Sequence, residues 1–75
     1  MIEIIFGNLL KEIRVEKRFS QEKLADLCSL DRTYISLLER GLRQPTLKTI
    51  FKISKALNIT PSEFIKKIEM QDEDR

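Results

Sequence analysis

The sequence predicts an all-α fold, and three observations indicate it. Apolar residues recur every three to four positions in five successive segments, as they do along one face of a helix. Each segment is bounded by residues that start or stop helices. Val, Thr and Gly, which strands and their turns need, are too sparse for a sheet. We therefore expect one compact five-helix domain over residues 1–75, with its acidic tail, residues 69–75, frayed.

The first helix is predicted from about Ile4 to Lys17. Its apolar residues recur at helical spacing and form one face, and charged residues such as Lys11 and Glu12 lie on the opposite side. Arg14 is unusual because it lies beside the apolar face rather than opposite it. A solvated arginine at the surface is the simplest interpretation of that position. The apolar face consists of Phe6, Leu9, Leu10 and Ile13.

Two short helical patterns follow, joined by about four residues. Ser20 is a good N-cap for the first pattern, and Ala25 permits another helix to approach closely. Asp31 caps the second pattern, in which Ile35 and Leu38 face inward. Two capped helices with so short a connection are typical of a helix-turn-helix, whose second helix reads DNA. The first pattern has the apolar stripe Leu24, Leu27 and Cys28, and the second leaves Arg32, Thr33, Ser36, Leu37 and Arg40 on its outer side.

Two further helices complete the chain. Gly41 ends the third helix, and Thr46 caps a fourth helix with a wide apolar face. Asn58 then breaks the pattern. The run Thr60-Pro61-Ser62-Glu63 combines a capping box with proline at the first helical position, so a fifth helix starts there. The fourth helix carries Leu47, Ile50, Phe51, Ile53, Ser54 and Leu57 on its apolar face, and the fifth carries Phe64, Ile65 and Ile68.

The fifth helix has more apolar surface than one small core uses. A domain of this size also gains from oligomerisation, because its core alone supplies little stability. We therefore expect a homodimer with a twofold interface along the fifth helix. The alternative is a fifth helix packed wholly within its own chain. The expected interface residues are Ile59, Phe64, Ile65 and Ile68.

Composition and charge exclude several functions. The net charge is +2, and because the last seven residues carry −3, the first 68 carry +5, which favours an anionic partner. With no histidine and one cysteine, Cys28, we expect no metal site, no cofactor and no disulfide within the chain. The sequence has no set of residues that would form a catalytic site, so an enzyme is not expected. The opening residues resemble neither a signal peptide nor a membrane span, which favours the cytoplasm.

The pattern as a whole resembles the phage repressor and Cro-type helix-turn-helix family, over roughly residues 6–65. Within that family, the run from Leu30 to Ser36, the short length and the absence of a second domain are most like the controller proteins of bacterial restriction-modification systems. The residues that carry the resemblance are Gln21, Leu24, Ala25, Leu30, Ile35, Ser36, Leu38, Glu39, Arg40, Gly41, Pro45, Thr46, Leu47 and Leu57.

Two positions depart from the family. Ser29 stands where the family usually has glycine, so a left-handed conformation there costs about 1 kcal/mol more than glycine. Leu37 stands where many relatives carry a polar residue that reads a base.

We expect the first turns of the third helix to meet the base edges of the major groove. Arg32 can donate to O6 and N7 of one guanine, and a phosphate contact is the alternative. Thr33 suits a thymine methyl group or a phosphate. Ser36 and Leu37 lie one turn later and also reach bases, although Leu37 suits a broad buried face equally well.

Contacts to the DNA backbone are expected near helix starts, where free N–H groups and the helix dipole favour a phosphate. Gln21 begins the second helix, and the resemblance implies such a contact there. Tyr34 either touches the backbone or packs beside the fourth helix. A solvated position is the alternative for any one lysine. The other expected backbone contacts are Arg40, Arg43, Gln44, Lys48 and Thr49.

The resemblance also implies a structural ion pair between Arg14 and Glu39. In the family, an arginine at this place in the first helix meets a glutamate at the end of the recognition helix. Such a pair fixes the angle between two helices rather than adding much net stability.

The resemblance to controller proteins also implies how this protein regulates transcription. A dimer binds a pseudo-palindromic operator upstream of its own gene and of the endonuclease gene, first activating and then, as a second dimer adds, repressing. Glu22, Asp26 or Glu39 would then touch RNA polymerase. The alternatives are a plain phage-type repressor, or an antitoxin or other helical interaction module.

Overall fold

A computed structural model describes residues 1–72 and contains five helices. They are α1 (Ile2–Glu16), α2 (Gln21–Cys28), α3 (Arg32–Glu39), α4 (Leu47–Ala56) and α5 (Pro61–Asp72). All regular structure within these residues is helical, as predicted. None of these helices is long and apolar enough to cross a lipid bilayer.

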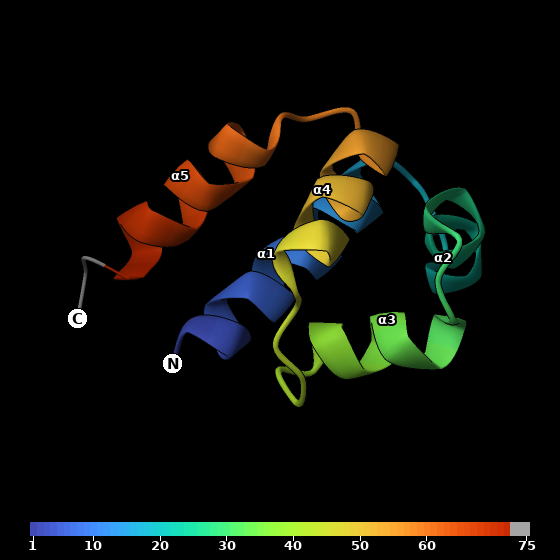
Figure 1. Ribbon diagram of the computed structural model, residues 1–75, viewed down its shortest axis with the longest axis horizontal. Helices are drawn as coiled ribbons and strands as arrows, with labels where there is room; N and C mark the ends of the chain where they lie inside the picture. Colours follow the sequence, from blue (N-terminus) through green and yellow to red (C-terminus); the bar gives the residue numbers. More distant parts are fainter. Residues whose placement is uncertain (73–75) are drawn as a thin grey trace.

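The helices pack around α1. This helix contacts α3 and α5, whereas α4 contacts α2 and α5, so α2 and α3 lie at one end of the molecule and α5 at the other (Figure 1). The rings of Phe6 in α1 and Phe64 in α5 stack with centroids 5.2 Å apart. The core consists of Phe6, Leu9, Leu10, Ile13, Leu24, Ala25, Cys28, Ile35, Leu38, Ile53, Leu57, Phe64 and Ile68.

Local capping explains where the helices start. The side chains of Ser20, Asp31 and Thr46 each accept a hydrogen bond from a backbone N–H in the first turn of the following helix. Thr60 and Glu63 form the predicted reciprocal capping box, with Thr60 N donating to Glu63 Oε1 at 3.0 Å and Glu63 N donating to Thr60 Oγ1 at 3.1 Å. Each predicted start is therefore confirmed to within two residues.

Left-handed residues explain where the helices stop. Ser29 has φ +55°, Gly41 +73° and Asn58 +60°. After each of them the chain turns away, which is the geometry of a helix C-terminus. Ser29 adopts the left-handed conformation although it has a side chain. The turn therefore forms as it would with glycine, at a cost of about 1 kcal/mol relative to glycine.

Three predictions from apolar spacing are wrong. Leu27 is exposed because α2 packs through Leu24, Ala25 and Cys28. On α4, Leu47 and Phe51 are 71% and 55% exposed, since the core takes only the side of that helix that carries Ile53 and Leu57. The spacing identified the apolar face of each helix but not which part of it another helix covers.

Helix α5 also differs from the expectation, because two of its four expected interface residues are buried within the chain. Phe64 and Ile68 are buried against α1 within the chain, so they belong to the core rather than to a surface open to a partner. Ile59 is half-buried and only Ile65 of the four is exposed. The buried Ile68 anchors the last turns of α5, and residues 69–72 are helical rather than frayed. The rest of the acidic tail lies outside the described residues.

Candidate nucleic-acid interface

The turn between α2 and α3 sets the geometry of the motif. Ser29 N donates to Asp26 O at 3.2 Å, and Leu30 N donates to Ala25 O at 2.9 Å. These two bonds satisfy carbonyl groups at the end of α2 and reverse the chain into α3. As a result, α3 lies at the edge of the molecule, where it packs against α1 and α2 (Figure 1).

The two sides of α3 separate cleanly. Ile35 and Leu38 are completely buried, whereas Arg32, Thr33 and Arg40 are exposed and Ser36 and Leu37 are partly exposed. Asp31 accepts a hydrogen bond from Thr33 N at 3.2 Å, which fixes the first turn of α3. The four expected base-reading residues thus share the outward side of one helix. Tyr34 is half-buried and packs against the core.

A buried ion pair holds the opposite end of α3. Arg14 Nε lies 2.6 Å from Glu39 Oε2, and Arg14 Nη2 donates to Glu39 Oε1 at 3.0 Å. Arg14 Nη1 donates to the carbonyl oxygen of Phe19 at 2.7 Å. The pair implied by the resemblance is therefore present, and it also ties down the connection between α1 and α2. Because both side chains are buried, the solvated interpretation of Arg14 is wrong.

Gln21 joins this network. Its amide nitrogen donates to Glu39 Oε1 at 3.0 Å, and its side chain is only partly exposed. The Gln21 side chain therefore links the start of α2 to the end of α3. The free N–H groups in the first turn of α2, which follow Ser20, remain suited to an anion.

The loop before α4 and the first turn of α4 contribute polar and cationic side chains from a second segment. Arg43, Gln44 and Lys48 are exposed there. Thr49 differs from the expectation, because its side chain is buried and its hydroxyl accepts a hydrogen bond from Thr46 Oγ1 at 2.9 Å. Thr49 thus completes the cap of α4, and with only 7% of its surface exposed it does not join the outward-facing residues.

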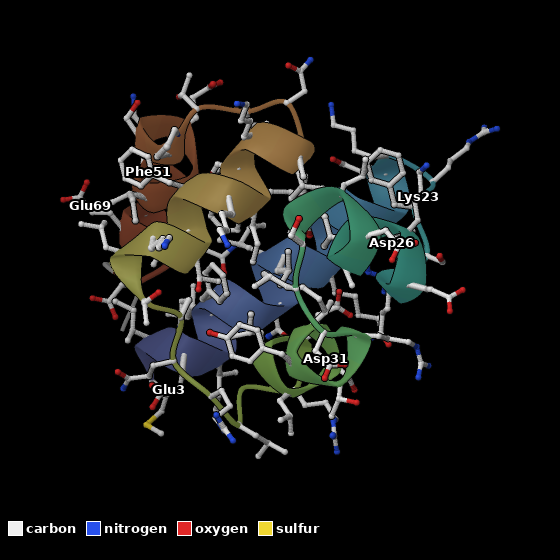
Figure 2. The ribbon with its side chains drawn as sticks, turned by 45° about the vertical axis from the view of Figure 1, so that its right-hand side comes forward. Glu3, Lys23, Asp26, Asp31, Phe51 and Glu69 are labelled. Carbon is white, nitrogen blue, oxygen red and sulfur yellow. The ribbon has the colours of Figure 1, made fainter. Side chains whose placement is uncertain are left out.

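The outer side of α2 carries charges of both signs. Lys23 and Asp26 project from it, and Asp31 marks the start of α3 (Figure 2). Glu22 is exposed as well. By contrast, Glu39 is buried and paired with Arg14, so its carboxylate cannot reach another protein.

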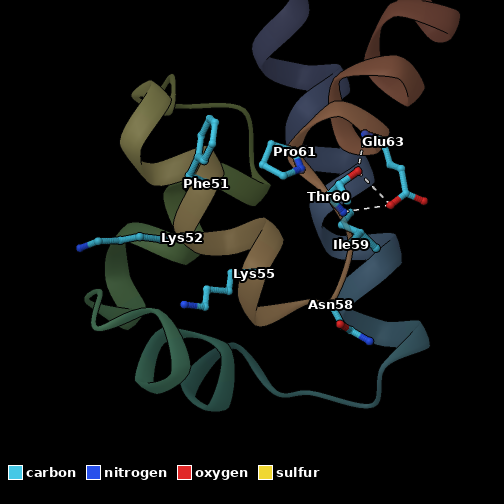
Figure 3. A pocket seen from close by; sticks show the side chains of 8 residues that line it. All are labelled: Phe51, Lys52, Lys55, Asn58, Ile59, Thr60, Pro61 and Glu63. Carbon is cyan, nitrogen blue, oxygen red and sulfur yellow. Dashed lines mark hydrogen bonds between the residues drawn. The ribbon is translucent and has the colours of Figure 1, made fainter.

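Apolar surface gathers on another side of the molecule. Phe51 stands beside Pro61 at the mouth of a groove between α4 and the start of α5, with Lys52 and Lys55 along one wall (Figure 3). A second groove, lined by Ile2, Ile50 and Ile65, runs between α1, α4 and α5. Sequence spacing did not reveal this surface, because it treated Leu47 and Phe51 as buried.

A capped helix pair that presents a polar outer face on its second helix defines a helix-turn-helix protein. Residues 10–64 match the protein family described as helix-turn-helix. Control protein C.BamHI of Bacillus amyloliquefaciens is 49% identical over 65 residues, which are 85% of this chain and 80% of the relative. Control protein C.MunI of a Mycoplasma species is 48% identical over 71 residues, covering 93% and 96% of the two chains.

A solved structure agrees with these relatives. The restriction-modification controller protein C.AhdI from Aeromonas hydrophila superposes with a TM-score of 0.80 at 45% identity, over 83% of this chain and 94% of that one. The chain belongs to the helix-turn-helix family of restriction-modification control proteins. It is thus a helix-turn-helix transcriptional regulator rather than an enzyme.

Proposed function

We propose that this protein binds a pseudo-palindromic operator as a homodimer, upstream of its own gene and of a neighbouring endonuclease gene, and there activates and then represses transcription. The observation that carries the proposal is the outer face of α3, where Arg32 and Thr33 are exposed in the first turn while Ile35 and Leu38 anchor the helix from behind. The likeness to a restriction-modification controller protein supports an endonuclease gene as one of the targets.

Base reading rests on the first two turns of α3. The planar fork of Arg32 matches O6 and N7 of a guanine, a contact that discriminates by about 1 to 3 kcal/mol. Thr33 fits a thymine methyl group or a phosphate. Ser36 and the exposed part of Leu37 lie one turn further along and complete the reading surface.

Phosphate contacts come from both sides of α3. The first-turn N–H groups of α2 at Gln21 form one set. Arg40, Arg43, Gln44 and Lys48 form the other, all of them exposed. With about four contacts in each subunit, the operator affinity of a dimer falls by about 10³ to 10⁵ between 50 and 200 mM salt.

The apolar surface on α4 and α5 suits the twofold contact. Leu47, Phe51 and Ile65 are exposed there, and Ile59 is half-buried beside them. This surface replaces the interface first expected from Phe64 and Ile68. Two recognition helices must then lie about 34 Å apart to read successive major grooves, so the half-sites are one helical turn apart.

Activation requires a contact with RNA polymerase. Of the three acidic candidates, Glu22 and Asp26 remain, because both are exposed on α2 whereas Glu39 is buried. Transcriptional control of bacterial genes also places the protein's action in the cytoplasm.

A footprint on the DNA upstream of the gene tests the proposal. The wild-type protein should protect two adjacent pseudo-palindromes, filling one before the other, and transcription in vitro should rise and then fall as protein is added. A single protected site with repression alone would instead indicate a plain repressor. Absence of any protected site, with the protein folded, would overturn the proposal and favour a protein-interaction module.

A further inference from the structure

The backbone of α1 lies unusually close to the end of α3. A Cβ atom built on Gly7 would stand 2.4 Å from the carbonyl oxygen of Leu38 and 2.8 Å from that of Glu39. Real Cβ atoms essentially never approach another heavy atom closer than 3.0 Å. The obstructing atoms are backbone oxygens, which cannot rotate away as a flexible side chain would. Only glycine permits this approach.

Gly7 is the middle of three contacts between the same two segments. One turn earlier, Ile4 lies against Gly41, where a Cβ would meet Ile4 Cγ1 at 2.9 Å. Two turns later, on the same face of α1, Arg14 holds the carboxylate of Glu39. The C-terminal end of α3 is therefore fixed to α1 along most of the length of α1.

The other end of α3, where the reading surface begins, lies away from the Gly7 and Glu39 contacts. It begins at Arg32, which is exposed, and α2 also packs against α3. An eight-residue helix is about 12 Å long. A small change in the angle of α3 at Glu39 therefore displaces the guanidinium of Arg32 at the other end of the helix. Such a displacement weakens a hydrogen bond between Arg32 and a base, because hydrogen bonds depend steeply on distance and angle.

We infer that Gly7 is a positioning residue for DNA reading, because its missing side chain lets α1 hold α3 at the angle from which Arg32 and Thr33 reach the base edges. The inference rests on the proposed function. It assigns a role in specificity to a residue that touches no DNA and lies 25 residues from the reading surface in sequence.

The test compares Gly7→Ala with two controls. Asn8→Ala makes a matched change at an exposed neighbour on α1, so it controls for altered helix propensity. Leu57→Ala truncates a fully buried side chain of the core and controls for lost stability without touching the contact between α1 and α3. Each protein is measured for its affinity for operator DNA and for unrelated DNA of equal length. Amide residual dipolar couplings report the orientation of α3 relative to α1.

Gly7→Ala should remain helical by circular dichroism, change the relative orientation of α3, and lose about tenfold or more of operator affinity. Its affinity for unrelated DNA, which depends on phosphate contacts, should change little. Both controls should keep the wild-type preference for the operator after correction for the folded fraction.

Unchanged dipolar couplings and an unchanged preference would overturn the inference. An equal loss of preference in Leu57→Ala would overturn it too, since stability alone would then explain the effect. So would a Gly7→Ala chain that stays unfolded in the cold with trimethylamine N-oxide added, because the contact would then serve folding as a whole. A wild-type protein without operator preference would refute the proposed function, and the dipolar couplings would still decide whether Gly7 orients α3.

Discussion

Arg14 and Glu39, 25 residues apart in sequence, meet through two buried contacts, Nε to Oε2 at 2.6 Å and Nη2 to Oε1 at 3.0 Å. Both oxygens of the Glu39 carboxylate accept a hydrogen bond from Arg14, and Oε1 accepts another from the amide nitrogen of Gln21. The pair joins α1 to the end of the recognition helix, so it connects the stability of the domain with the placement of its reading surface.

Removal of one partner should therefore destabilise the domain. Arg14→Ala leaves the Glu39 carboxylate buried without its cation, and we expect a loss of about 3 to 5 kcal/mol in the free energy of unfolding. Arg40→Ala is the matched control, since Arg40 is exposed and its loss should cost less than about 0.5 kcal/mol. Urea titration followed by circular dichroism measures both. A wild-type free energy of unfolding for Arg14→Ala would refute the structural role of the pair.

Arg32 should affect recognition without affecting the fold. Arg32→Ala removes an exposed side chain and should lose about 1 to 3 kcal/mol of discrimination between the operator and a site whose guanine is replaced. Arg32→Lys keeps the charge but not the planar fork, so it should retain affinity for unrelated DNA and still lose discrimination. Fluorescence anisotropy at fixed salt measures both quantities. Equal losses on the two DNA sites would instead identify Arg32 as a phosphate contact.

Phe51 should control the proposed dimer. Its side chain is 55% exposed, so Phe51→Glu should leave the fold intact while placing a charge in the apolar surface of α4 and α5. Val15→Glu makes the same kind of change at a residue of α1 that is 56% exposed. Sedimentation velocity at micromolar concentration should show a monomer for Phe51→Glu and a dimer for Val15→Glu. Dimers from both variants would place the interface elsewhere.

Glu63 should make stability sensitive to acid. Accepting a hydrogen bond from the backbone N–H of Thr60, and a second one from the Thr60 hydroxyl, lowers the pKa of Glu63 below its ordinary value of 4.5. Because the folded state favours the charged carboxylate, this stabilisation is present above pH 4.5 and is lost as the pH falls through the lowered pKa.

Glu63→Gln removes that titration while keeping an acceptor for the cap. Its melting temperature should therefore fall less steeply than that of the wild type below pH 4.5, and the two curves should run parallel near neutral pH. Thermal melts from pH 7 to pH 3 provide the comparison. Parallel curves over the whole range would show that the cap does not depend on the charge.

Local sequence signals predicted the elements of this fold well. Ser20, Asp31 and Thr46 start helices because their side chains bond to backbone N–H groups a few residues ahead, and Gly41 and Asn58 stop them through their own backbone conformation. Because these interactions join residues that are three or four positions apart at most, they can be predicted from the sequence alone. The outward position of Arg32 and Thr33 followed in the same way from helical spacing.

The sequence by itself thus determined five helices, their caps and the polar outer side of α3, because each depends on near neighbours in the chain. Tertiary structure alone decided that Phe64 and Ile68 fill the core, that Leu47 and Phe51 remain exposed, and that Thr49 is enclosed by its cap. It also decided that Gly7 meets the carbonyl groups of α3. These features depend on which helix covers which face and how closely two backbones approach, and periodicity within one helix contains no information about either.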